Sequence, residues 1–116
     1  MLESVAINAL HAAMRGLHER QSAITDDIAN VNTPFFRARS VQFEGSLKQA
    51  LAGGDDPLAA TTPTVQVSDA PAGLNGNNVD LAAETLASVD TELAYQLALR
   101  AAGDRFSILR TAIKGA

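Results

Sequence analysis

Two histidines and two adjacent aspartates are the first residues in the chain that could do chemistry. His11 and His18 are seven residues apart, so on a helix they share a face but lie two turns from each other. That separation is too large for both to bind one metal ion, as a pair spaced by four would. Asp26 and Asp27 project about 100° apart on a helix, which does not suit a carboxylate pair that shares a proton. We expect all four to be ordinary polar side chains of a helix.

The remaining acids, glycines and hydroxyl groups form no catalytic motif either. Asp55 and Asp56 follow Gly53-Gly54 without the spaced ligands of a calcium loop, and acids directly after paired glycines do not form a phosphate loop. Serines and threonines are present, but no nucleophile-elbow motif includes them. The sequence therefore predicts no catalytic residue, no metal or cofactor site, no small-molecule substrate and no enzyme activity.

Composition excludes several further classes of protein. The chain has 116 residues, of which 47% are hydrophobic and only 4% aromatic, and its net charge is −4. It lacks the positive charge of a nucleic-acid-binding protein, so we expect no nucleic-acid partner. With no cysteine, it has neither disulfides nor a thiolate metal site. We also expect no membrane span and no cleavable signal peptide, because long apolar runs and a basic leader are missing.

One long amphipathic helix is predicted over residues 1–33. Its apolar residues recur with the seven-residue spacing of a coiled coil, and Gln21 is the one polar residue in that seam. Small residues flank the seam, among them Gly16, whose cost of about 1 kcal/mol in a helix close packing could offset. The predicted seam consists of Ile7, Leu10, Met14, Leu17, Gln21, Ile24, Ile28 and Val31.

A sharp corner is predicted where this helix ends. Pro34 has no backbone N–H and favours extended geometry in the residue before it, and Asn30 can bond to backbone groups that are free at a helix end. Two phenylalanines follow directly, which suggests a fixed corner. We assign to it Asn30, Thr33, Pro34, Phe35, Phe36 and Arg37.

Residues 34–79 are predicted to hold this corner, one short helix and loops. Apolar spacing favours a helix over Val41 to Ala52, followed by an exposed loop that begins at Gly53. Thr64 to Val67 alternates weakly and predicts one short strand. Asn75-Gly76 predicts a turn.

The second long helix is predicted over residues 80–115, with Asp80 as its N-cap. Leu97 and Leu99 point about 200° apart on this helix, so it is apolar on two faces. One face could pair with the first helix and leave the other for a different chain. The first row contains Leu86, Val89, Leu93 and Leu97, and the second contains Tyr95, Leu99, Ala102, Phe106, Leu109 and Ile113.

These elements predict a mostly α fold in a single domain spanning residues 1–116. The long N- and C-terminal helices form an antiparallel, coiled-coil-like hairpin, with the short helix and irregular loops between them. Two long alanine-rich helices, one of them apolar on two sides, imply a subunit that completes its core only by assembly.

The corner also resembles a family signature. Flagellar rod and hook proteins of bacteria carry a run of the form N-I-A-N-x-x-T-P-G-Y-K/R, and this chain matches it at Ile28-Ala29-Asn30, Thr33-Pro34, Phe36 and Arg37. Asp27 stands in place of the first Asn, and Phe35 in place of the Gly, which permits backbone angles that Phe adopts only at a cost.

Three C-terminal segments are similar to basal-body rod members of the same family. They are Gly76-Asn77-Asn78-Val79-Asp80-Leu81, Tyr95-Gln96-Leu97-Ala98-Leu99-Arg100 and Ala112-Ile113-Lys114-Gly115. Ala82 stands where the family usually has Glu. The resemblance covers both ends of the chain and leaves the middle without a match.

The resemblance implies a structural subunit of the proximal flagellar rod, which assembles helically through its terminal helices and helps to transmit torque. Implied partners are other rod subunits, further copies of the chain, and the membrane-ring and export-gate junction with its adaptor. The implied location is the periplasmic rod of the basal body, reached by type III export without a cleavable signal. Two alternatives from other classes are a different helical secretion-filament subunit and a small soluble helical adaptor or chaperone.

Overall fold

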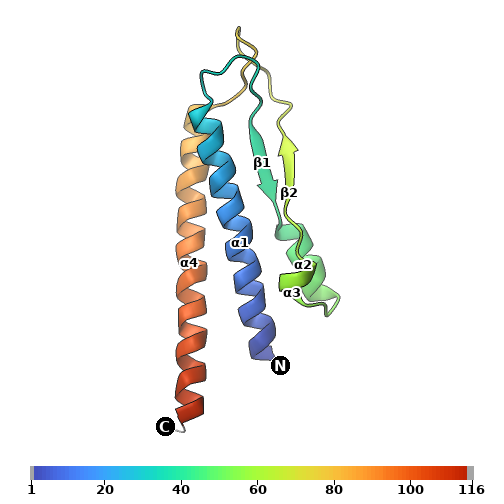
Figure 1. Cartoon of the computed structure of the whole chain (residues 1–116), viewed down its shortest axis with the longest axis vertical. Coiled ribbons are helices and arrows are strands. Elements are labelled where there is room, and N and C mark those ends of the chain that lie inside the picture. The colour runs from blue at the N-terminus through green and yellow to red at the C-terminus, as the bar shows by residue number, and fades with distance from the viewer. Residues whose placement is uncertain (1, 115–116) are drawn as a thin grey trace.

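The computed structural model describes residues 2–114, which form an elongated body of 65 × 27 × 14 Å (Figure 1). Two long helices run antiparallel along it, α1 (Leu2–Ala29) and α4 (Leu81–Lys114). Between them in sequence lie β1 (Arg39–Gln42), α2 (Glu44–Ala52), α3 (Pro57–Ala60) and β2 (Thr64–Val67). β1, α2 and α3 pack on α1, and β2 pairs with β1, so that α1 lies between this middle segment and α4. The predicted mostly α fold with an antiparallel helical hairpin is confirmed. None of the helices described is both long and apolar enough to cross a membrane.

The first helix ends earlier than predicted, at Ala29 instead of residue 33. Asn30 bonds back to the last turn, since both its backbone N–H and its side-chain amide donate to the Asp26 carbonyl. The side chain of Asn77 binds the carbonyls of Asn30 and Thr33, which a continuing helix would use itself. Val31, which was assigned to the helix seam, therefore lies in a turn.

The predicted helix over Val41 to Ala52 is wrong in its first residues. Val41 and Gln42 belong to β1, and α2 begins only at Glu44. β1 pairs antiparallel with β2, with Val41 opposite Val65 and Gln42 opposite Thr64. The strand forms because alternation turns Val41 into the core against α1, whereas the helical spacing begins at Phe43. The predicted strand over Thr64 to Val67 is confirmed, although its pairing partner was not predicted.

The loop predicted after Gly53 contains a helical turn, α3. Asp56 caps it by accepting from the Leu58 N–H at 3.1 Å, and Pro57 occupies its first position, where no N–H is needed. Pro57 is fully buried, and α1 holds this turn in place because Asn8 donates to the Asp56 carboxylate. Gly53 to Asp56 are exposed as predicted, as are Ala59, Ala60 and Thr62, whereas Pro57 and Thr61 are buried.

The core of the molecule lies where α1 packs against the middle segment and against α4. Its buried apolar side chains are Ala12, Leu17, Ile24, Ala38, Val41, Phe43 and Ala50. Gly16 packs closely, as predicted, but against a ring and not against a helix: a Cβ there would stand 2.3 Å from the Phe43 ring. The start of α4 is also as predicted, since the Asp80 carboxylate accepts from the Ala83 N–H at 3.1 Å. Met1 and Gly115, included in the predicted helices, lie outside the described residues.

Candidate assembly surface

A row of four large apolar side chains runs along the outer side of α4. Leu86 is 63% exposed, Val89 60%, and Leu93 and Leu97 59% each. We call these four residues the outer row. Monomeric proteins seldom expose a contiguous apolar stripe of this kind, which is typical of a surface that binds another protein.

The outer row faces away from α1 because the other side of α4 suits close helix contact. Small or polar residues recur there at helical spacing, and they are half-buried or buried: Ala87, Thr91, Ala94 and Ala98. Small side chains let the two helix axes approach closely, so the larger side chains are left on the opposite side. The spacing in the sequence thus separates two faces, and contact with α1 selects which of them is covered.

The second predicted row of α4 is only partly covered by α1. Leu99, Phe106 and Ile113 are each more than half exposed, while the side chain of Leu109 lies outside the described part of the structure. Figure 1 shows the reason, since the C-terminal end of α4 extends past the N-terminal end of α1. The last turns of α4 therefore have apolar residues but no α1 beside them.

The structure divides the predicted α1 seam into buried and half-buried positions. Leu17 and Ile24 are buried, whereas the other seam residues described within α1 are half-buried. Gln21 lies in the contact with α4, where its Nε2 donates to Ser88 Oγ at 2.8 Å while its Oε1 is buried without a partner. Whether the seam residues bind other subunits stays a prediction.

The corner brings two segments that resemble the family into contact, the signature run at the end of α1 and the segment Gly76 to Leu81 before α4. Asn77 and Asn78, both buried, come from the second segment and satisfy backbone groups of the first. Asn77 Nδ2 lies 2.8 Å from the carbonyls of both Asn30 and Thr33, and Asn78 Oδ1 accepts from the Ala38 N–H at 2.7 Å. Sequence reasoning quoted these asparagines in a motif but did not assign them a role. The feature of the sequence that could have indicated this role is a pair of neighbouring side-chain amides shortly before the helix N-cap Asp80.

Phe35 adopts a backbone conformation that favours glycine, the residue that the signature has at this position. Its φ is 63°, in the left-handed region that costs a residue with a Cβ about 1–2 kcal/mol. The Phe35 N–H donates to the Asn75 carbonyl at 3.0 Å, and its ring covers Gly76, where a Cβ would stand 2.5 Å from the ring. The side chain as a whole is 81% exposed. The predicted turn at Asn75-Gly76 is thus the surface on which Phe35 rests.

The other corner residues join the corner to β1 and to the segment before α4. Phe36 is half-buried, its carbonyl accepts from the Asn78 N–H, and the Arg39 guanidinium lies 5.9 Å from its ring centroid. Arg37 donates to the Ala70 carbonyl. Pro34 is exposed, and Thr33 Oγ1 donates to Asn30 Oδ1 at 3.0 Å. Hydrogen bonds therefore hold the corner together, and the Phe36 ring contacts Arg39 beside it.

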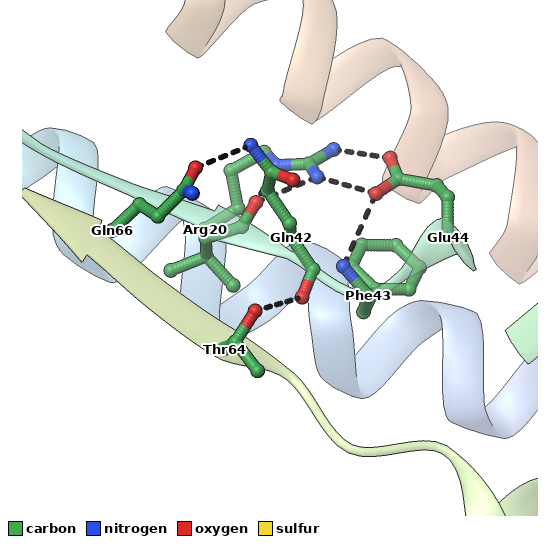
Figure 2. A network of polar contacts seen from close by, with 7 residues as sticks. Arg20, Gln42, Phe43, Glu44, Thr64 and Gln66 are labelled. Atoms are coloured by element: carbon green, nitrogen blue, oxygen red, sulfur yellow. Dashed lines mark hydrogen bonds and ion pairs between the residues drawn. The ribbon is translucent and has the colours of Figure 1, made fainter. Parts of the chain in front are cut away.

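Arg20 anchors the middle segment to α1 (Figure 2). Its guanidinium donates to both carboxylate oxygens of Glu44 at 2.7 Å and to the Val41 carbonyl, and it stacks 5.0 Å from the centroid of the Phe43 ring. The hydrogen bonds from Arg20 lower the pKa of Glu44 to about 2. Across the strand pair, Gln42 donates to the Gln66 side chain and Thr64 to the Gln42 carbonyl. Sequence reasoning missed this anchor, because Arg20 and Glu44 meet only in the folded chain.

A carboxyl pair was also missed. Asp27 has no exposed surface, both its oxygens lie 3.1 Å from the Arg39 N–H, and its carboxyl group hydrogen-bonds to that of Glu84. Burial and the neighbouring Asp27 raise the pKa of Glu84 to about 7, and burial also raises the pKa of Asp27. The expectation that Asp27 is an ordinary polar side chain is therefore wrong. Its partner is on α4, whereas the adjacent Asp26 is exposed to solvent.

Within the described residues, no group of three or more His, Cys, Asp or Glu side chains could hold a metal ion.

Comparison with curated proteins finds relatives along most of the chain, although no family profile matches it. The flagellar basal body rod protein FlgB of Cereibacter sphaeroides (strain ATCC 17029 / ATH 2.4.9) is 33% identical over 120 residues, which cover 91% of this chain and 92% of that protein. FlgB of Escherichia coli (strain K12) is 30% identical, with 82% of this chain and 88% of that protein covered. FlgB of Bacillus subtilis (strain 168) is 27% identical, with 98% and 97% covered. The resemblance of the two terminal segments to rod proteins thus extends along nearly the whole length, and the chain belongs to the FlgB family of flagellar basal body rod proteins.

Proposed function

We propose that this protein is a structural subunit of the proximal rod and that it assembles helically through the outer row of α4. The observation that carries this proposal is the exposure of all four side chains in that row. Covering a large apolar side chain contributes about 1.5–3 kcal/mol when it is fully exposed beforehand, so four side chains that are roughly 60% exposed favour association strongly. The relatives are all named as flagellar basal body rod proteins, which supports the rod as the place where this association occurs.

The form of the assembly follows from the shape of the subunit. When the outer row of one copy binds a different surface on its neighbour, the contact repeats and an open helical polymer results. The corner joins the two helices of the hairpin at one end, and Gln21 of α1 donates to Ser88 of α4 along their contact. A subunit braced in this way can help to transmit torque along the rod without its helices sliding past each other.

Partners and location are part of the same proposal. We expect contacts with further copies, with other rod subunits, and with the membrane-ring and export-gate junction through its adaptor. The site of action is the periplasmic rod, reached by type III export without a cleavable signal peptide. The role is structural and not enzymatic.

The test compares charge substitutions inside and outside the outer row. Leu93→Glu together with Leu97→Glu places two charges in the outer row, whereas Leu51→Glu places one on the exposed face of α2. Each variant is expressed in the source bacterium from which the native gene has been removed. We expect the double variant to abolish rod assembly and motility and Leu51→Glu to retain both. Circular dichroism should show native helix content in both variants.

The same variants separate the alternatives. If motility survives in the double variant, the outer row is not the assembly surface. If concentrated wild-type protein forms a closed complex of fixed mass by light scattering, the chain behaves as an adaptor. An open polymer that grows with concentration and is absent in the double variant supports the proposal.

A further inference from the structure

The carboxyl groups of Asp27 and Glu84 meet where α1 ends and α4 begins. Asp27 stands in the last turn of α1, where the helix dipole disfavours a negative charge, and Glu84 in the first turn of α4, where the dipole favours one. Asp27 is completely buried, and the one backbone donor it shares between its two oxygens is the Arg39 N–H. The contact therefore joins three elements, α1, α4 and β1.

A hydrogen bond between two carboxyl groups requires a proton on one of them. An ionised carboxylate has only acceptor oxygens, so two ionised groups at this position would repel each other. Asp27 already accepts from Arg39 with both oxygens, which suits an ionised group. Glu84 is thus the member that holds the proton and donates it to Asp27.

The surrounding charges do not neutralise a doubly ionised pair. Asp26 on α1 and Asp80 at the start of α4 add negative charge, and Arg39 on β1 is the cation that acts on Asp27. The Arg39 guanidinium lies over the Phe36 ring. Arg20 lines the same groove as Glu84, but it forms its salt bridge with Glu44. Among the residues that the structure describes, no salt bridge to Asp27 or Glu84 is present.

We propose that the Asp27–Glu84 pair is a proton-dependent latch, closed when the two carboxyl groups share one proton and weakened when that proton is lost. Closed, it holds the end of α1, the start of α4 and the first residue of β1 together. Opened, it places two like charges in a buried contact, and the junction beside the corner loosens. This device does not depend on the proposed assembly, since every group in it belongs to one chain.

The direction of the pH effect follows from the pKa of Glu84. Its folded-state pKa is raised to about 7 from an ordinary value near 4.5, so between these values the folded chain binds a proton that the unfolded chain does not. The contribution of the latch to stability is therefore complete below about pH 4.5 and is lost as the pH rises through about 7. Asp27, whose pKa is also raised, acts in the same direction.

The experiment is an NMR titration of the whole chain from about pH 4 to about pH 9, a range that spans both values of the Glu84 pKa. It follows the side-chain carboxyl carbon of Glu84 and the backbone amide of Arg39. We expect Glu84 to titrate with a midpoint near 7 and the Arg39 amide to shift with the same midpoint. Hydrogen exchange of that amide, corrected for its intrinsic pH dependence, should become faster above the midpoint.

Two variants complete the test. Glu84→Gln keeps a donor for Asp27 but cannot titrate, so the Arg39 amide should lose its transition near pH 7 while its exchange stays slow at high pH. Asp26→Asn removes an equal charge from the exposed neighbour and should leave the transition in place. A Glu84 midpoint near 4.5 would overturn the proposal. So would an Arg39 transition that persists in Glu84→Gln.

Discussion

The two long helices have similar composition but different surroundings. α1 has α4 on one side and β1, α2 and α3 on the other, so its large apolar residues from Ile7 to Ile28 are buried or half-buried. Among the described elements α4 packs chiefly on α1, and its outer row is more than half exposed. The middle segment of the chain completes the burial of α1 and leaves α4 uncovered. We therefore expect α1 to contribute most to the stability of the single subunit, and α4 to provide the contact with other chains in the proposed assembly.

The largest difference between the two helices is expected when a phenylalanine in or beside each of them is replaced by alanine. Phe43→Ala removes a buried ring that packs on Gly16 of α1, and it should lower the free energy of unfolding by about 3–5 kcal/mol. Phe106→Ala removes a half-exposed ring of α4 and should change it by less than about 1 kcal/mol. Urea unfolding followed by circular dichroism measures both. Equal losses in the two variants would mean that the surroundings of α1 and of α4 contribute equally to the stability of the subunit.

Two glycines inside the helices give opposite expectations. In Gly16→Ala the new Cβ meets the Phe43 ring at 2.3 Å, and the overpacking should destabilise the protein by about 1–3 kcal/mol. In Gly103→Ala of α4 the new Cβ has no atom within 4 Å beyond the adjacent backbone of its own helix, so the better helix former should stabilise the protein by about 0.5–1 kcal/mol. Thermal unfolding of the two variants should shift in opposite directions. A shift in the same direction for both would contradict the one-sided packing of α4.

Arg20→Met tests the anchor that holds the middle segment on α1. Losing the charged hydrogen bonds to Glu44 and to the Val41 carbonyl should cost about 1.5 kcal/mol, at the low end for charged groups because the Glu44 side chain is 61% exposed. The lowered pKa of Glu44 also sets a pH effect. The wild-type protein should lose this stability as the pH falls from about 4.5 towards about 2, and the variant should not. Unfolding measured across that range decides, with Lys48→Met on α2 as a control that removes an exposed charge.

The smallest effect is expected for Gln21→Leu, in the contact between the two helices. The substitution removes a buried amide oxygen that has no partner, but it also removes the hydrogen bond to Ser88. The net change should be a stabilisation of about 0.5–1 kcal/mol, together with less specific association, because a polar seam residue fixes register. Chemical unfolding gives the first quantity and electron microscopy of assemblies the second. A clear loss of stability would show that the Ser88 hydrogen bond outweighs the unpaired oxygen.

Much of the helical architecture could be predicted from the sequence because its causes are local. The seven-residue spacing of α1, the N-cap at Asp80 and the two apolar rows of α4 all depend on neighbours within one or two turns. The strand over Thr64 to Val67 and the turn at Asn75-Gly76 were predicted on the same basis. The resemblance to rod proteins supplied the family, and it depended on residues near the two ends of the chain.

The features that could not be predicted depend on contacts between residues far apart in sequence. Asn77 could not be assigned to Asn30, nor Arg20 to Glu44, because helical or strand spacing does not specify which side chains meet across the fold. Val41 was predicted in a helix, and pairing with Val65 placed it in a strand. Asp27 lacks a local partner, and burial beside Glu84 changes its chemistry. The sequence by itself thus determined the long helices and their apolar faces through local periodicity. Tertiary packing determined which face stays exposed, because a face is covered only where another element reaches it.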